Sequence, residues 1–198
     1  MADHLMPSLI NLLSSLLQRV AESNDLNCPL NTQKLSVFNG LIRPNISVQS
    51  YLERIFRYAN CSPSCYVVAY VYLDRFVRKQ PYLLINSFNV HRLLVTSVLT
   101  SIKFMDDICY NNAYYARIGG ISTAEMNVLE VDFLFGLGFN LNVTPDTFRD
   151  YCMYLQTEMM MGYPPLCSTP QNPAKGIDHC LIDEEDSQSQ HHNQQLVV

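Results

Sequence analysis

The sequence predicts an all-α protein with one helical body, a helix before it and a tail after it. Apolar residues recur at helical spacing along most of the chain, and capping residues and prolines divide these runs into separate helices. Of the 198 residues, 48% are hydrophobic and only 16% are charged. This composition supplies ample material for a core and excludes a wholly disordered chain.

The first 22 residues are predicted to form an amphipathic helix. The apolar residues at helical spacing are Leu9, Leu12, Leu13, Leu16, Leu17 and Val20. Asp3 and His4 stand where a signal peptide carries basic residues, so no export signal is visible. Residues 23–45 are rich in Asn, Ser, Thr and Pro and are interpreted as a linker, which Leu35, Val37 and Phe38 could pin to the body.

The body is predicted over residues 46–161, as five helices followed by a sixth. Ser47 caps the first helix, and Ser62 followed by Pro63 begins the second as a cap with a first-turn proline. The second helix is apolar on almost every side, which is typical of a helix enclosed by its neighbours. Its valine-rich run also suits a strand, but its length and its proline start favour a helix.

The remaining helices also have recognisable starts and stops. The third extends from about Asn86 to Asp106 and is again apolar enough to be central. A short fourth helix ends at Gly119 and Gly120, because glycine tolerates the left-handed conformation of a helix end. The caps that open the later helices are Asn111, the capping box of Ser122 and Glu125, and Thr144 before Pro145.

The net charge of −5 is distributed unevenly. Residues 162–198 hold five acidic residues against one lysine, and their Pro-rich, then acidic and Gln-rich composition predicts a disordered tail. Residues 47–105 carry seven basic residues against two acidic ones, whereas residues 106–161 carry eight acidic residues against two basic ones. A surface with two signs of charge suits docking to a complementary partner.

One candidate docking patch follows from the basic half of the body. Its residues are Arg54, Arg57, Arg75, Arg78 and Lys79. The overall negative charge argues mildly against a nucleic-acid partner. No apolar stretch reaches the ~20 residues that a membrane-spanning helix needs, so no membrane partner is expected.

No motif of catalysis or of cofactor binding is present. A nucleophile at Cys61 or Cys65 with His91 and Asp106 has no supporting pattern, and the histidines near Cys180 lack zinc-ligand spacing. Phosphate-binding glycine motifs are also missing. We therefore expect a protein that is not an enzyme and that holds no metal and no cofactor. Seven scattered cysteines without a C-x-x-C pair indicate reduced thiols, in the nucleus, the cytoplasm or both.

Four motifs carry a resemblance to a known family. They are Tyr-Val-Tyr-Leu-Asp-Arg-Phe at 70–76, Thr-Ser-Ile-Lys-Phe at 100–104, Asn-Ala-Tyr-Tyr-Ala-Arg-Ile-Gly-Gly-Ile at 112–121 and Met-Asn-Val-Leu-Glu at 126–130. In this order and spacing they resemble a cyclin box over about residues 35–160. Within the cyclins the chain is similar to the plant U-type group, also called P-type, which is itself similar to the PHO-type cyclins of yeast.

The resemblance implies a single five-helix cyclin box that binds a cyclin-dependent kinase, of the A-type PSTAIRE class. Two positions that the family uses at the kinase interface match Lys103 and Glu130. The resemblance therefore implies that Lys103 donates to backbone carbonyls beside the kinase C-helix and that Glu130 accepts from nearby backbone N–H groups. The alternative is an ion pair between these two residues within the chain, and the two roles are compatible.

The implied function is that of a non-catalytic regulatory subunit that positions the kinase C-helix, in cell division or in phosphate and nutrient signalling. A scaffold with the cyclin fold that activates no kinase is the competing hypothesis. Residues 51–56 lack the Met-Arg-Ala-Ile-Leu pattern with which cell-cycle cyclins dock substrates.

Overall fold

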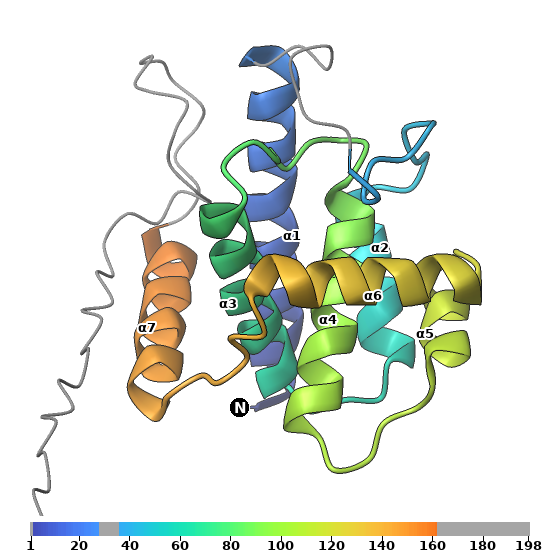
Figure 1. Ribbon diagram of the computed structural model, residues 1–198. Coiled ribbons are helices and arrows are strands. Elements are labelled where there is room, and N and C mark those ends of the chain that lie inside the picture. The colour runs from blue at the N-terminus through green and yellow to red at the C-terminus, as the bar shows by residue number, and fades with distance from the viewer. Residues whose placement is uncertain (1, 28–35, 162–198) are drawn as a thin grey trace, which may run out of the picture.

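The computed structural model describes residues 2–27 and 36–161, and over these ranges the chain is all-helical, without a strand (Figure 1). The helices are α1 (Ala2–Asn27), α2 (Val48–Tyr58), α3 (Ser64–Lys79), α4 (Val90–Met105), α5 (Asn112–Gly119), α6 (Thr123–Leu137) and α7 (Pro145–Met161). The predicted fold class is confirmed. The predicted tail at 162–198 lies outside the described residues.

Helix α4 is the centre of the bundle. It packs against α2, α3, α5 and α6, and α6 crosses in front of it (Figure 1). Every residue from Leu93 to Ile102 is buried, including four with hydroxyl groups. Each hydroxyl donates to a carbonyl of its own helix three or four residues back, as Thr100 does to Thr96 at 2.9 Å. These hydroxyls therefore need no partner on another helix, and the neighbouring helices can approach α4 closely.

A cluster of aromatic rings joins α3, α6 and the segment before α2. The rings of Phe76 and Phe133 stack at 4.7 Å, and Phe38 meets Phe76 edge-on at 5.4 Å. Phe38 is fully buried, so the expected attachment of this segment to the body is confirmed for Phe38. Gly136 gives the cluster room, because a Cβ atom there would lie 2.1 Å from a ring carbon of Phe76.

Helix starts follow the predicted caps in most places. The side chains of Ser47, Asn111 and Ser122 accept hydrogen bonds from backbone N–H groups of the helices they precede. Ser62 does not cap α3: Pro63 holds the capping position, and the Ser62 hydroxyl donates to Asp106 at 2.6 Å. The chain leaves α5 and α6 through left-handed glycines, as predicted for α5.

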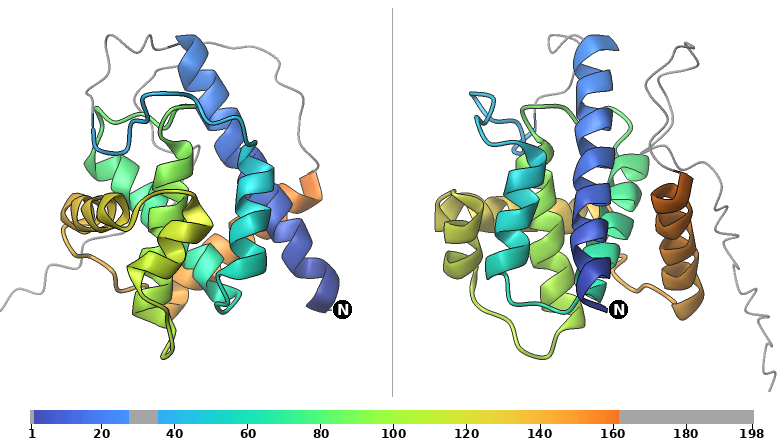
Figure 2. Two further views of the ribbon diagram at one scale, coloured as in Figure 1. Left: turned by 90° about the vertical axis from the view of Figure 1, so that its right-hand side faces the viewer. Right: turned by 180° about the vertical axis from the view of Figure 1, so that it is seen from behind.

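Helix α1 continues to Asn27, five residues beyond its predicted end, so the predicted linker begins later than expected. The extension is held by long-range contacts. Asn24 donates to the carbonyl of Ile85 at 2.8 Å, and the Asp25 carboxylate accepts from the backbone N–H and hydroxyl of Ser87. Seen from behind, α1 lies across the bundle between α2 and α7 (Figure 2). Within the described ranges, no helix has the length and apolarity needed to cross a membrane.

Substitution of Gly136 by alanine should destabilise the protein. Alanine in an open helix interior is favoured over glycine by about 1 kcal/mol, but here the added methyl group meets the Phe76 ring. Overpacking of this kind costs about 1–3 kcal/mol. Urea unfolding should show a lower midpoint for Gly136→Ala, and the loss should shrink in a Phe76→Leu background. If Gly136→Ala raised the urea midpoint of the chain that retains Phe76, the contact between residue 136 and the Phe76 ring would be contradicted.

The stability of the fold should depend on pH through His91. This side chain is buried and its Nε2–H donates to the carbonyl of Ile46 at 2.9 Å. Burial lowers the pKa of His91 below its ordinary 6.5. As the pH falls, the unfolded chain therefore binds a proton at His91 at a higher pH than the folded chain does. The contribution of His91 to the free energy of unfolding is fully present above about pH 6.5 and decreases as the pH drops below that value. Urea midpoints at pH 7.5 and 5.5 should differ less for His91→Gln than for the natural chain.

Candidate functional site

The structure brings Lys103 and Glu130 together. Lys103 lies in the last turn of α4 and Glu130 in the middle of α6, and Nζ of Lys103 is 2.7 Å from Oε1 of Glu130. The two side chains are 34% and 15% exposed. The intrachain ion pair left open by the sequence is therefore present, and it lies where solvent can still reach the lysine.

Asn112 holds the other oxygen of the same carboxylate. Its Nδ2 donates to Oε2 of Glu130 at 2.7 Å and to Oδ1 of Asn127 at 2.7 Å. Asn112 is the first residue of α5, so three helices meet at this carboxylate. An ammonium group has three N–H donors and each carboxylate oxygen has two lone pairs. The pair is therefore fixed in position and retains donors and acceptors for a further partner.

Helix α6 carries an apolar stripe on the side that faces away from the core. We call Val128, Val131 and Phe135 the outer face of α6; they are 53%, 53% and 69% exposed. With about 100° per residue, Val131 lies about 100° around the helix from Glu130, and Phe135 and Val128 lie further round, at about 140° and 160°. Beside Lys103, Phe104 is 48% exposed. Large apolar side chains gathered on an exposed face often mark a contact site, so this face is suited to being covered by another molecule.

The predicted basic patch is divided into two groups. Arg57 lies in the last turn of α2, where the chain passes into α3, whereas Lys79 ends α3. Because α3 has 16 residues, about 24 Å of helix separates these two places (Figure 1).

The arginines and the lysine of α3 are used within the fold. Arg75 donates to the carbonyls of Asn140 and Asn142, and Lys79 donates to the carbonyl of Leu137 at 2.6 Å. These bonds fasten the link between α6 and α7. Arg78 pairs at 2.9 Å with Asp74, a buried carboxylate that also accepts from the Tyr151 hydroxyl.

On α2, the guanidinium of Arg54 lies 4.9 Å from the centre of the Tyr51 ring. Arg54 therefore contacts a ring of its own helix, and Arg57 lies in the last turn of the same helix.

Comparison with known proteins decides the family. The cyclin family model matches residues 3–141, which is most of the chain. The chain belongs to the cyclin family. It is 62% identical over 195 residues to cyclin-U4-1 of Arabidopsis thaliana, covering 98% of this chain and 96% of that protein. It is 57% identical to cyclin-P4-1 of Oryza sativa subsp. japonica over 91% of this chain and 86% of the relative. Within the cyclins it is thus a plant U-type or P-type member, as the four motifs indicated.

Cyclins are regulatory proteins and are not catalytic themselves. Among the described residues no three His, Cys, Asp or Glu side chains are grouped so that they could hold a metal ion. What the Lys103 and Glu130 pair offers is recognition: one cationic donor and one anionic acceptor, side by side, next to apolar side chains. Charge-assisted hydrogen bonds from such groups are about twice as strong as neutral ones.

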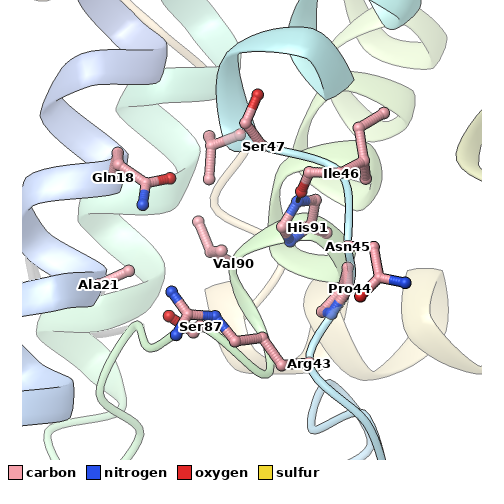
Figure 3. Close-up of a pocket in the computed structure, with 11 residues that line it drawn as sticks. Gln18, Ala21, Arg43, Pro44, Asn45, Ile46, Ser47, Ser87, Val90 and His91 are labelled. Carbon is pink, nitrogen blue, oxygen red and sulfur yellow. Dashed lines mark hydrogen bonds between the residues drawn. The ribbon is translucent and has the colours of Figure 1, made fainter.

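A pocket of about 250 Å³ lies elsewhere on this cyclin, between α1, residues 43–48 and the start of α4. Figure 3 shows Arg43 reaching beneath Val90 toward Ser87, with His91 above it beside Ile46 and Gln18 across from them on α1. Lys103 and Glu130 are not among its lining residues. The pocket is therefore separate from the candidate site.

The outer face of α6 was missed by the sequence interpretation, which followed only the inward residues of this helix. A signal was present. The stretch from Met126 to Leu137 contains more apolar residues than one buried stripe requires, and the surplus recurs at positions 128, 131 and 135.

The Lys103 and Glu130 pair should contribute little to the stability of the free cyclin. Because the lysine is one-third exposed, a double-mutant cycle with Lys103→Ala and Glu130→Ala should give a coupling of about 0.2–1 kcal/mol. Urea unfolding of the two single variants and the double variant measures this energy. Loss of the cooperative transition in either single variant would show instead that the pair is essential to the fold.

Proposed function

We propose that this cyclin is the regulatory subunit of a cyclin-dependent kinase, and that it holds the kinase C-helix in its active position. The observation that carries the proposal is the Lys103 and Glu130 pair, fixed by Asn112 and set beside the exposed outer face of α6. We further propose a kinase of the A-type PSTAIRE class, a role in cell division or in phosphate and nutrient signalling, and a location in the nucleus, the cytoplasm or both.

Each part of the site has a distinct role in this proposal. Lys103 donates to kinase backbone carbonyls and Glu130 accepts from kinase backbone N–H groups, which fixes the orientation of the two proteins. The outer face of α6, with Phe104, supplies the apolar area that drives association. The apolar contact also excludes water around the pair, and hydrogen bonds to charged groups then become stronger than in the free cyclin.

The proposed effect on the kinase is a shift in its conformational population. A kinase positions the phosphates of ATP only when a lysine on its third strand pairs with a glutamate on the C-helix. A cyclin that binds this arrangement more tightly than the inactive one shifts the equilibrium by the difference in affinity. This cyclin contributes a surface and no catalytic group, so the rate increase depends entirely on that difference.

Replacement of Lys103, Glu130 or Phe135 by alanine should weaken binding to a purified PSTAIRE-class kinase. Truncation of a hot-spot residue near the centre of an interface lowers the binding free energy by about 2 kcal/mol or more. We therefore expect the dissociation constant to rise about 30-fold or more. Isothermal titration calorimetry measures the constant, and circular dichroism should show unchanged helix content because all three side chains are partly exposed.

Arg149→Ala provides a matched control. Arg149 pairs with Asp146 on α7, and both side chains are more than half exposed. Its loss should leave kinase affinity unchanged. If Lys103→Ala and Glu130→Ala bind as tightly as this control, the assigned interface is wrong. If the natural chain binds the kinase but leaves phosphate transfer to a peptide substrate at its basal rate, the scaffold hypothesis replaces activation.

A further inference from the structure

Two thiols gather at the junction of α2 and α3. Cys61 lies in the link between the helices and is half-buried, while Cys65 lies in the first turn of α3 and is fully buried. The thiol of Cys65 lies beside the Cys61 sulfur, and its hydrogen bond to that sulfur lowers the pKa of Cys61. The same contact, together with burial, raises the pKa of Cys65. Cys61 is therefore the more exposed of two neighbouring thiols, and Cys65 is the buried one.

The two other free cysteines among the described residues lack this arrangement. Cys109 is exposed and Cys152 is half-buried. Burial raises the pKa of Cys152. Redox-sensitive cysteines combine a low pKa, access to solvent and a second thiol within reach. In the described part of the chain, Cys61 and Cys65 together meet these conditions.

The pair is also joined to the end of the helix that carries Lys103. Ser62, between the two cysteines, donates from its backbone N–H and its hydroxyl to the Asp106 carboxylate at 3.0 and 2.6 Å. Asp106 is the residue that ends α4, three positions after Lys103. Although partial burial raises it, the hydrogen bonds from Ser62 hold the pKa of Asp106 below its usual value. The hydroxyl of Ser62 also lies 3.2 Å from the sulfur of Cys65.

We propose that Cys61 and Cys65 are a site of oxidative modification, at which a peroxide converts the two thiols to a disulfide and weakens the anchor at the end of α4. The disulfide draws residues 61–65 together and moves the Ser62 donors away from Asp106. The last turn of α4, which carries Lys103, then loses its attachment to the start of α3.

The chemistry balances with hydrogen peroxide as the oxidant. The Cys61 thiolate attacks one peroxide oxygen, the O–O bond breaks, and the departing hydroxide takes a proton to leave as water. This gives a sulfenic acid on Cys61. The Cys65 sulfur then attacks the Cys61 sulfur, the S–S bond forms as the S–O bond breaks, and the hydroxide leaves with the Cys65 proton as a second water. Two thiols are oxidised by two electrons, and one peroxide is reduced.

Peptide mapping tests the modification directly. Trypsin cleavage after Arg57 and Arg75 releases residues 58–75, which contain both cysteines of the pair and no other. After treatment of the full chain with a small excess of hydrogen peroxide and alkylation without reductant, this peptide should be lighter by two hydrogen atoms and free of alkyl groups. The change should reverse with dithiothreitol and should appear before any oxidation of Cys109.

Three variants separate the roles of the sulfurs. Cys65→Ser should stop at the sulfenic acid, which dimedone traps on Cys61, and Cys61→Ser should leave Cys65 unoxidised. Cys109→Ser is the matched control and should form the disulfide at the natural rate. If the 58–75 peptide with its disulfide does not form under conditions that oxidise Cys109, the proposal is overturned. Cys61 and Cys65 would then serve only in packing.

The effect on α4 rests on the proposed function and is measured separately. Kinase affinity should fall several-fold on peroxide treatment of the natural chain, recover with dithiothreitol and stay constant in Cys61→Ser. A linked peptide with unchanged affinity would overturn the coupling to Lys103. If the reduced chain binds no kinase at all, the proposed function fails, whereas the linked peptide would still establish the modification site.

Discussion

The rest of the structure depends on the burial of the middle of α4, from Leu93 to Ile102. This stretch is enclosed by four other helices and has little access to water, so each of its polar side chains needs a partner within the protein. The sequence meets this requirement with small hydroxyl residues that bond back to their own backbone, at positions where larger polar residues would remain unpaired. The helix emerges from this enclosure only at its ends, and Lys103 stands at one of them. The candidate site is therefore positioned by the core.

Helix α6 serves two surfaces at once. Its inner side packs on the core through residues such as Phe133, and Gly136 keeps that contact close. Its outer face is apolar as well, with Glu130 on the boundary between the two. Burial of the inner face fixes the rotation of the helix about its axis, and that rotation decides which side chains face outward. Packing and recognition thus constrain the same fifteen residues.

The sequence was sufficient for the fold because local signals agreed with each other. Apolar spacing, proline starts and glycine ends all gave the same helix order. The failures came from contacts between distant residues. Asn24 and Asp25 extend α1 by binding Ile85 and Ser87, which no local pattern records.

Long-range contacts also limited the prediction of individual roles. Glu125 was expected in a capping box. Its backbone N–H does donate to the Ser122 hydroxyl, but its carboxylate accepts two hydrogen bonds from Arg92. The basic patch was proposed from charge along the chain, whereas Arg75 and Lys79 bind carbonyls across the fold. Lys103 and Glu130 were found because a family motif marks them.

The apolar outer face of α6 has a consequence for the amount of this protein in a cell. A cyclin that exposes Val131 and Phe135 when alone is prone to self-association and to recognition by chaperones and proteases. Any molecule that covers this face stabilises the folded chain by mass action. The steady-state level of the protein should therefore follow the supply of the molecule that covers this face, and excess copies should be degraded. The same stripe of side chains that suits association would also limit how long an orphan copy survives.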